Sequence, residues 1–572
     1  MLDKFEIASA LREIALLLEL KQENPYKSRA YSTGAAALES VNEDIGAVIQ
    51  QGRLTSIRGI GESLAGQIAE LYTSGSSSML ERLREELPPG VLELSQVPGL
   101  SVKKIQLLHA ELGIKSIPEL EAACRAGQVS LVKGFGKKTE TNILEGIRLY
   151  ETREQVELLL TARQTCAHLL QHIRGKRDIQ LAEVAGSVRR WQETVRNINM
   201  VVAAADPDSA VESLESFALV TRLERPADDR AIARLASGMR VYFRVVPPED
   251  FACAWLCETA SREHVEALKE LAHQRGYALT SQGLTKGGQP VRTASEADVY
   301  SHLGLPFMPP ELRENVDDVS AALNGAAFDD LIEVDDIQGM THCHTVYSDG
   351  KATVEEMVRA AEALGMKYIT ITDHSPAAHY AGGLQLDRLH RQWEEIDAVQ
   401  EKIPNVRIFR GTESDILEDG SLDYPDSILD RFDIIIASIH SRMKMDREQM
   451  TKRVVNCMRK RQFKIWGHAL GRLLLRREPF QCDVEAILDV IAESKAAIEV
   501  NGDPYRLDME PRWIREARKR NIPFVISVDA HSTGALSYIR YGVHIARRGG
   551  LRKREILNAL APEEFAARVK PA

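Results

Sequence analysis

The 572-residue sequence lacks three features that would each assign it to a class of protein. Its seven cysteines include no Cys-x-x-Cys pair, which argues against a disulfide framework or a zinc ribbon. No apolar run approaches the roughly 20 residues needed to cross a bilayer. Residues 1–6 open an acidic amphipathic helix without a basic segment, a long apolar segment or a small-residue cleavage site. We therefore expect a cytoplasmic protein with no membrane partner.

An excess of positive charge is also absent. The chain has 83 acidic and 73 basic residues and a net charge of −10, so the whole molecule is no simple polyanion binder. Any contact with nucleic acid must come from a local patch or from backbone amides. The apolar fraction of 44% and the charged fraction of 27% are those of an ordinary soluble globular protein. The length predicts about three or four domains.

One short pattern occurs three times in residues 1–150, which read as helices joined by turns. The pattern is apolar-x-Gly-apolar-Gly, and it occurs at 57–61, 97–101 and 132–136. In the middle copy, Ser101 replaces the second glycine. This helix-hairpin-helix pattern predicts DNA binding that reads no base sequence, because glycines let the backbone approach a phosphate bound by amides at a helix N-terminus. The predicted contact residues are Gly59, Gly61, Gly99, Gly134 and Gly136.

Pairs of lysines follow two of these turns and can add phosphate contacts: Lys103, Lys104, Lys137 and Lys138. The alternative is that the turns only join packed helices and that the lysines lie on solvated helix faces. Three copies within one region favour DNA binding.

A nucleotide-binding arrangement follows in residues 150–320. Apolar segments at 179–185, 198–203 and 239–246 are predicted to be strands. The first ends in a Gly186-Ser187 turn that leads into a helix bearing Arg190. A strand, a tight turn and a helix of this kind can hold a nucleoside triphosphate.

Residues 186–194 read Gly186-Ser187-x-Arg189-Arg190-x-x-Glu193-Thr194. By this motif, residues 1–320 resemble the polymerase core of the family X DNA polymerases. The resemblance implies four domains: a helix-hairpin-helix lyase-like domain (1–90), a fingers-like helix-hairpin-helix region (91–150), an α/β nucleotidyltransferase-like palm (151–247) and a thumb-like domain (248–320).

The sequence departs from that family at its reactive positions. Asn197, Asn199 and Tyr242 stand where the family has three metal-binding aspartates, and Gln67 stands where lyase-competent relatives have a lysine. The sugar-reading motif has become Ala260-Ser261-Arg262-Glu263-His264-Val265. Because of these departures, polymerase activity is expected to be absent or very weak, and the resemblance does not imply lyase activity. Gly186, Ser187 and Arg190 remain, so weak nucleotide binding without turnover is expected.

After a linker at 321–336, apolar segments alternate with amphipathic helices. One helix is predicted at 354–364, where Thr353 and Glu356 form a capping box. This alternation predicts a (β/α) barrel, whose chemistry lies at the C-terminal ends of its strands. The apolar segments are 368–372, 407–410, 433–439, 463–466, 496–500 and 524–528.

Metal-ligand residue types follow almost every one of these strands. His342 and His344 are two residues apart near an earlier strand end, so both imidazoles point to the same side. The others are Asp349, His374, Glu413, His440, His468, Asp529 and His531. The alternative for each is a polar cap at a strand end. Six histidines and three carboxylates on one rim favour a metal site instead.

Residues 337–572 resemble the PHP (polymerase and histidinol phosphatase) domain, a distorted seven-stranded (β/α) barrel with three metals. The matching motifs are His342-x-His344, Ser348-Asp349-Gly350, Thr372-Asp373-His374-Ser375, Glu413, Ser438-Ile439-His440-Ser441, His468 with Gly471-Arg472, and Asp529-Ala530-His531. Ala469 departs from the proline of many relatives.

The PHP resemblance also divides the ligands among the metals. The first metal is expected on His342, His344, Glu413 and Asp529, which are also the expected catalytic set. The second is expected on Asp349, His374 and His531, and the third on His440, His468 and bridging Glu413. Mixed histidine and carboxylate ligands suit Mn²⁺, Zn²⁺ or Fe²⁺.

Such metals would bring the pKa of a bound water toward neutrality and hold phosphate oxygens, so a phosphoester substrate is expected. Arg472, Arg506 and Lys444 can neutralise phosphate charge, and Glu499 can orient a ligand histidine. The prediction is a multidomain, DNA-binding PHP phosphoesterase that acts as a metal-dependent 3′–5′ exonuclease in DNA repair. One alternative is an active family X polymerase with an associated exonuclease. Another is a non-catalytic DNA-binding scaffold with structural metals.

Overall fold

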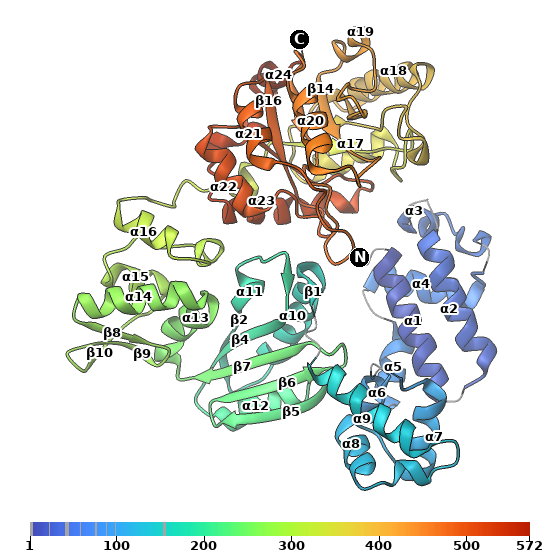
Figure 1. Cartoon of the computed structure of the whole chain (residues 1–572), viewed down its shortest axis with the longest axis vertical. Coiled ribbons are helices and arrows are strands. Elements are labelled where there is room, and N and C mark those ends of the chain that lie inside the picture. The colour runs from blue at the N-terminus through green and yellow to red at the C-terminus, as the bar shows by residue number, and fades with distance from the viewer. Residues whose placement is uncertain are drawn as a thin grey trace.

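The computed structural model describes residues 4–21, 23–40, 45–57, 59–74, 77–86, 89–95, 97, 99–152 and 156–571. Residues 1–3, Arg58 in the first hairpin and Pro98 in the second lie outside the described residues. Figure 1 shows helical domains at the N-terminal end, two mixed domains in the middle and a barrel at the C-terminal end. Among the described helices, none combines the length and the apolar character needed to span a membrane.

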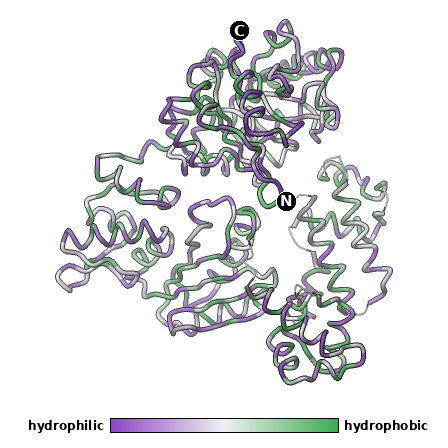
Figure 2. The backbone as a smooth tube through the Cα atoms, viewed as in Figure 1, coloured by the Kyte–Doolittle hydropathy of each residue, from purple (hydrophilic) through white to green (hydrophobic). Residues whose placement is uncertain are grey.

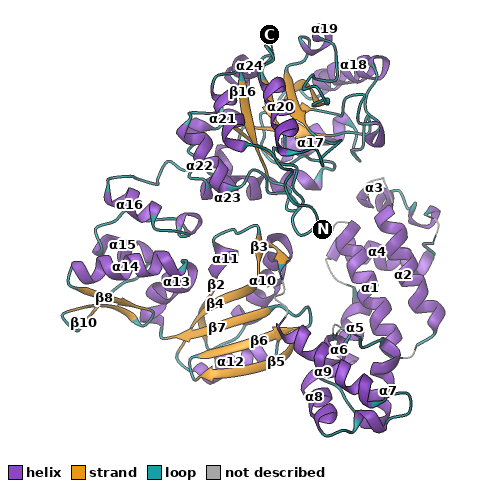
Figure 3. Ribbon diagram, in the orientation of Figure 1, coloured by secondary structure: helices purple, strands orange, loops and turns teal. Residues whose placement is uncertain are grey.

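The described part of residues 1–152 is helical, as predicted, and contains no strand (Figure 3). Its buried side chains form two separate hydrophobic cores, one within residues 7–83 and one that joins Leu20 to residues 91–150. The helices are α1 (Lys4–Leu20), α2 (Pro25–Ser40), α3 (Ile45–Gln50), α4 (Glu62–Ser74), α5 (Ser78–Glu86), α6 (Pro89–Leu94), α7 (Val102–Leu112), α8 (Ile117–Arg125) and α9 (Lys137–Thr152).

A five-stranded mixed sheet forms the palm-like region. Its order is β2 (Ile179–Ala185), β4 (Asn197–Ala204), β7 (Arg240–Val246), β6 (Arg230–Leu235) and β5 (Val220–Ala227). Only the β4–β7 pairing is parallel. The three predicted strands are therefore confirmed, and the sheet sets them side by side. Its helices are α10 (Leu159–Arg174), α11 (Gly186–Arg189) and α12 (Pro207–Glu215), and β1 (Glu157–Leu158) pairs with β3 (Thr194–Val195).

The thumb-like region packs helices against a small antiparallel sheet. Its elements are α13 (Phe251–Thr259), α14 (Arg262–Gln274), β8 (Tyr277–Thr280), β9 (Gly283–Lys286), β10 (Gln289–Val291), α15 (Glu296–His302) and α16 (Asp317–Leu323). Its own core lies within residues 253–322. In the segment predicted as a linker, Ile332 is fully buried and its N–H donates to Leu551 O at 3.1 Å, so this segment packs on the barrel.

Seven parallel strands in sequence order form the C-terminal barrel. They are β11 (Gly339–Cys343), β12 (Tyr368–Ile371), β13 (Arg407–Asp415), β14 (Ile434–Ser438), β15 (Lys464–Trp466), β16 (Ala496–Asn501) and β17 (Phe524–Ser527). A parallel bridge between Cys343 and Ala530 joins the first strand to the end of the last, so the barrel closes. The predicted (β/α) barrel is confirmed.

Helices surround the strands of this barrel. They are α17 (Val354–Ala363), α18 (Leu386–Lys402), α19 (Asp426–Leu429), α20 (Arg447–Met458), α21 (Val484–Ala492), α22 (Pro511–Lys519), α23 (Ile539–Arg548) and α24 (Pro562–Val569). The predicted capping box is present, because Thr353 N–H donates to the Glu356 carboxylate and Glu356 N–H donates to Thr353 Oγ1. Figure 2 shows hydrophobic residues in every part of the chain, in keeping with a core in each region.

The palm and the barrel share one continuous hydrophobic core. At their junction the Trp191 ring stacks on the His544 ring of α23, with centroids 3.6 Å apart. Beside the stack, the Glu193 carboxylate pairs with Arg548 at 2.5 Å and with Arg472 at 3.4 Å. The retained motif residue Glu193 therefore faces the barrel.

The thumb-like region also contacts the barrel through buried carboxylates. Glu311 lies 2.6 Å from His544 Nδ1 and 2.9 Å from Arg547 Nε. Asp318 accepts two hydrogen bonds from the Arg515 guanidinium, both at 2.9 Å. These contacts hold the thumb-like region against the barrel helices α22 and α23.

Candidate metal centre and nucleic-acid contacts

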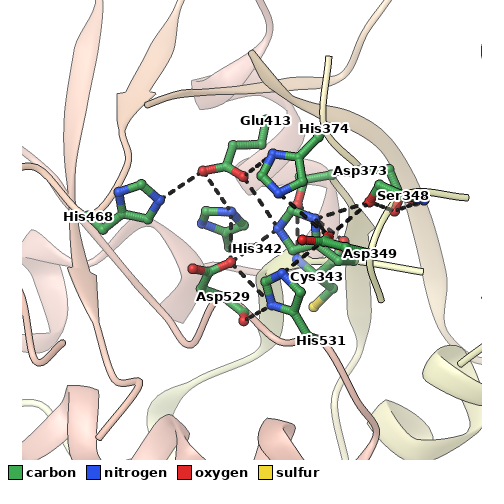
Figure 4. Close-up of polar contacts among 12 residues, drawn as sticks. His342, Cys343, Ser348, Asp349, Asp373, His374, Glu413, His468, Asp529 and His531 are labelled. Atoms are coloured by element: carbon green, nitrogen blue, oxygen red, sulfur yellow. Dashed lines mark hydrogen bonds and ion pairs between the residues drawn. The ribbon is translucent and has the colours of Figure 1, made fainter. Parts of the chain in front are cut away.

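The predicted ligand residues come together at the C-terminal ends of the barrel strands, and Figure 4 labels most of them. Within the described residues, the ligand atoms form three groups in which all atoms lie within 4.8 Å of one another. The groups are His342, His344, Glu413 and Asp529; His344, Asp349, His374 and His531; and His374, Glu413 and His440. The parallel strands place these side chains together because their carboxyl ends meet on one rim.

The first group is the one expected from sequence. His342, His344 and Glu413 are almost fully buried, and Asp529 is 7% exposed. The two Nε2 atoms lie 3.1 to 3.5 Å from carboxylate oxygens of Glu413 and Asp529. Among the described residues, His342 Nε2, His344 Nε2, Glu413 Oε2 and Asp529 Oδ1 are buried without a hydrogen-bond partner. Four unpartnered donor atoms that converge in this way fit a divalent metal ion.

The second group contains the three expected residues and also His344. Asp349 Oδ1 lies 3.2 Å from His531 Nε2 and 3.5 Å from His374 Nε2. The side chains of Asp349 and His531 are 33% and 35% exposed, so this group forms the open edge of the centre. The structure thus makes His344 common to the first two groups.

The third group differs in membership from the expected set. His440 Nε2 lies 3.2 Å from Glu413 Oε1, and His374 Nδ1 lies 2.9 Å from Glu413 Oε2. His468 Nε2 contacts the same carboxylate at 2.9 Å but stands outside the three groups. Glu413 therefore contacts both histidines of the expected third set, and His374 is an additional member of the observed group.

Buried carboxylates outside the predicted ligand set hold the ligands in place. Glu499 Oε1 lies 2.6 Å from His342 Nδ1, as the sequence predicted for an orienting carboxylate. Asp415 Oδ1 lies 2.8 Å from His440 Nδ1, a contact that sequence reasoning missed. Asp373 accepts hydrogen bonds from the N–H and Oγ1 of Thr345, at 2.8 and 2.6 Å, so it braces a loop.

Electrostatics keep the carboxylates of the centre ionised. Burial raises the pKa of Glu413, but the imidazoles of His440 and His374 lower it well below its usual value. Burial lowers the pKa of His342, but the carboxylates of Glu499 and Asp529 raise it well above its usual value. A cation that binds here must displace the proton of His342, so its affinity depends on pH.

Two candidate ligands adopt a left-handed backbone that residues with a Cβ rarely take. His468 has φ +24° and Asp529 has φ +52°. Such conformations cost of order 1–3 kcal/mol each and persist where surrounding structure holds them. The sequence gives no sign of this strain.

Arg506 is the predicted cation that lies closest to the ligand groups. Its Nε lies 3.4 Å from Asp529 Oδ2, while its Nη1 is buried without a hydrogen-bond partner among the described residues. Arg472 donates instead to Arg506 O at 2.9 Å and contacts Glu193 and Glu510. Lys444 is exposed.

A separate cavity of about 720 Å³ lies between the palm-like and thumb-like regions. Part of its lining comes from the predicted nucleotide-binding residues Gly186, Ser187 and Arg190. The altered residues Asn197 and Asn199 line the same cavity. The Gly186 backbone has φ +62°, and a Cβ there would lie 2.9 Å from Asn199 Cγ. Arg190 donates to Glu314 at 2.8 Å and to Thr259 O at 2.5 Å.

Tyr242 is the register partner of Asn199 on the neighbouring strand. Two acids that lie close to these positions in the sequence, Glu193 and Asp206, make their contacts elsewhere. Glu193 is paired with barrel arginines, and Asp206 caps α12 by accepting from the Asp208 N–H. Every group of three or more candidate ligands in the described part of the chain lies in the barrel.

The three hairpins share one turn geometry. In each, an N–H donates to the carbonyl three residues earlier: Ile60 to Ile57, Leu100 to Val97, and Phe135 to Val132, at 3.0, 3.1 and 2.9 Å. Gly59, Gly99 and Gly134 have φ +102°, +82° and +94°. The middle apolar residue is buried and the glycines are exposed. Each turn leads directly into α4, α7 or α9, so the first amides of each helix, which have no acceptor within the helix, lie next to the exposed glycines.

Family comparisons cover most of these regions. Residues 3–77 match a helix-hairpin-helix domain, and 52–113 and 91–149 match a SAM-like helix-hairpin-helix tandem. Residues 254–314 match the DNA polymerase beta thumb, and residues 341–503 match the PHP domain.

The names of similar proteins refer to DNA polymerase and exonuclease activity or to phosphatase activity. The "DNA polymerase/3′-5′ exonuclease PolX" of Bacillus subtilis is 34% identical, over 99% of both chains. A "probable phosphatase" of Thermoanaerobacter is 29% identical over 38% of this chain and 89% of its own length. DNA polymerase lambda of Rattus norvegicus is 24% identical over 51% of this chain and 53% of its own.

Proposed function

The chain belongs to the family X DNA polymerases that carry a C-terminal PHP domain, and on that basis we propose that it is a metal-dependent 3′–5′ exonuclease of DNA repair. The observation that carries the proposal is the convergence of four buried, unpartnered ligand atoms in the first group. A buried polar atom without a hydrogen-bond partner costs about 1–3 kcal/mol, so four in one place support a cation site.

The ligand sets of the proposal follow the geometry. His342, His344, Glu413 and Asp529 hold one metal; Asp349, His374 and His531 with His344 hold a second; and His440, His374 and Glu413, with His468 beside them, hold a third. Mn²⁺ and Zn²⁺ are the proposed ions. When bound, they supply an activated water and positive charge for the phosphoryl oxygens.

The side chains around the ligands have defined tasks in this proposal. Glu499 and Asp415 orient His342 and His440 through their Nδ1 atoms, so each Nε2 faces the centre. The unpartnered Nη1 of Arg506 binds a phosphate oxygen. The hairpins and the palm hold the DNA strand whose end is cut, without reading its sequence.

We further propose that the palm does not polymerise DNA. Asn197 and Asn199 present neutral amides and Tyr242 an aromatic ring, so three formal negative charges that hold catalytic cations in the family are absent. Gly186, Ser187 and Arg190 still line the cavity, which supports weak nucleotide binding. A working polymerase is the alternative, and primer extension distinguishes the two.

A non-catalytic scaffold with structural metals is the other alternative. Structural metal sites are closed by protein ligands, whereas catalytic sites keep an open position. The one-third exposure of Asp349 and His531 leaves the second group open to solvent and favours a catalytic centre.

The decisive experiment incubates end-labelled DNA with the protein and Mn²⁺, with and without nucleotides. Shortening without extension is expected, and replacement of both His342 and His344 by alanine is expected to abolish it while DNA affinity remains. His390→Ala, an exposed histidine of α18, is the matched control. Full nuclease activity in the double variant would contradict the assignment.

A further inference from the structure

One exposed aromatic ring stands beside the buried ligands of the barrel. Tyr380 is 70% exposed, although its ring centroid lies only 6.1 Å from that of His374 and 6.2 Å from that of His440. The planes are tilted by 60° and 63°, so neither imidazole stacks on the tyrosine ring. An aromatic ring in this position offers solvent an apolar surface next to the reacting centre.

The loop that carries this ring is held firmly. Its neighbours Ala378 and Ala381 are 1% and 3% exposed, so they anchor the loop on both sides of Tyr380. Leu384 N–H donates to His374 O at 2.8 Å. A Cβ on Gly383 would lie 1.9 Å from Ser375 O, so the backbone packs too closely there for any other residue. The fold therefore displays the ring rather than leaving it on a loose segment.

Positive charge also lies beside the ligands and the ring. The Nη1 atom of Arg506 is buried without a hydrogen-bond partner among the described residues, and the Nε atom of the same side chain contacts Asp529. Arg477 is near enough to Tyr380 for the two groups to interact electrostatically. A planar ring beside a cationic, metal-ligating centre matches a nucleotide, which joins a flat base to an anionic phosphate.

We propose that Tyr380 is a specificity-determining residue that stacks on the base of the 3′-terminal nucleotide while the phosphate to be cut lies over the ligand groups. The role rests on the proposed exonuclease function. Stacking on one side chain is tolerant of base identity, because every base has a π face. The ring thus selects nucleic-acid ends over phosphoesters that lack a base, without selecting a sequence.

The test pairs two end-labelled single strands that differ only at the 3′ terminus, one with a normal nucleotide and one with an abasic residue. Wild-type protein in Mn²⁺ is expected to cleave the normal end about ten-fold faster in kcat/KM, the order that one base–aromatic stack supplies. Tyr380→Ala is expected to slow the normal end to the abasic rate and to leave the abasic rate unchanged. Tyr380→Phe keeps the ring and is expected to keep the preference.

Leu364→Ala, which removes an apolar side chain that is 45% exposed and lies just after α17, controls for loss of exposed apolar surface. An equal fall on both substrates in Tyr380→Ala would overturn the stacking role, as would a wild-type protein that cuts both ends equally. Failure of the wild type to cut either substrate would overturn the exonuclease function itself, and this role with it.

Discussion

Replacement of Glu499 by glutamine should weaken metal binding without unfolding the barrel. Glu499 is fully buried, lies 2.6 Å from His342 Nδ1 and accepts a hydrogen bond from Ser527 Oγ. It also accepts from Asn501 Nδ2 at 3.2 Å and from the His468 N–H. Glutamine keeps the shape but loses the negative charge and one acceptor oxygen.

The magnitude follows from that geometry. Loss of the partner that orients a ligand histidine costs about 10- to 100-fold in metal affinity, or about 1.4–2.7 kcal/mol. One effect opposes this loss, because removal of Glu499 also lowers the pKa of His342 and so reduces competition from protons. A divalent ion carries twice the charge of a proton, so it loses more from the missing carboxylate. Affinity is therefore expected to fall.

The assay is calorimetric titration of chelator-treated protein with Mn²⁺ or Zn²⁺, with circular dichroism as a check on folding. Glu401→Gln, the same change on an exposed residue of α18, is the control. Asp415→Asn should weaken binding in a similar way, because Asp415 orients His440. An unchanged affinity in a folded Glu499→Gln variant would refute the argument that this carboxylate supports the ligand.

Three further outcomes are expected. The variant with alanine at His342 and His344 should show no template-directed primer extension, and robust extension would show that the palm is catalytic. Alanine at Lys137 and Lys138 should reduce the slope of log affinity against log salt by about one for each phosphate that is no longer neutralised; an unchanged slope would remove these lysines from the interface. Burial raises the pKa of Glu311, but its histidine and arginine partners lower it to about 2 from 4.5. That shift contributes about 3 kcal/mol to the free energy of unfolding above pH 4.5, and this contribution is lost as the pH falls toward 2. Glu311→Gln should therefore lower stability at neutral pH and flatten the acid-unfolding curve, and a curve like that of the wild type would contradict this.

The barrel strands could be predicted because almost every apolar segment is followed by a ligand residue type. Parallel strands place their carboxyl ends on one rim, so His342, Glu413 and Asp529 had to meet once the alternation was recognised. The hairpins were equally predictable, because each turn needs a glycine with positive φ at a fixed place.

The finer arrangement depends on contacts that leave no local pattern. The place of His374 beside Glu413 and the pairing of Asp415 with His440 depend on how neighbouring strands pair, which the sequence does not show. Glu193 lies in a palm motif, yet its partners are arginines 279 and 355 residues further along. The position of Tyr380 beside the ligands could not be predicted from sequence periodicity, because the residues around it belong to other loops.

The contacts between the palm and the barrel bear on whether the barrel can be separated from the rest of the chain. A fragment that begins at residue 337 would uncover the His544 ring that Trp191 stacks on, and it would leave Arg472 and Arg548 without Glu193. Because Arg472 also donates to the backbone of Arg506, this cut would disturb the wall of the metal centre. The barrel is therefore not an independent unit in this chain, and a fragment that begins at residue 337 is expected to lose contacts that support the metal centre.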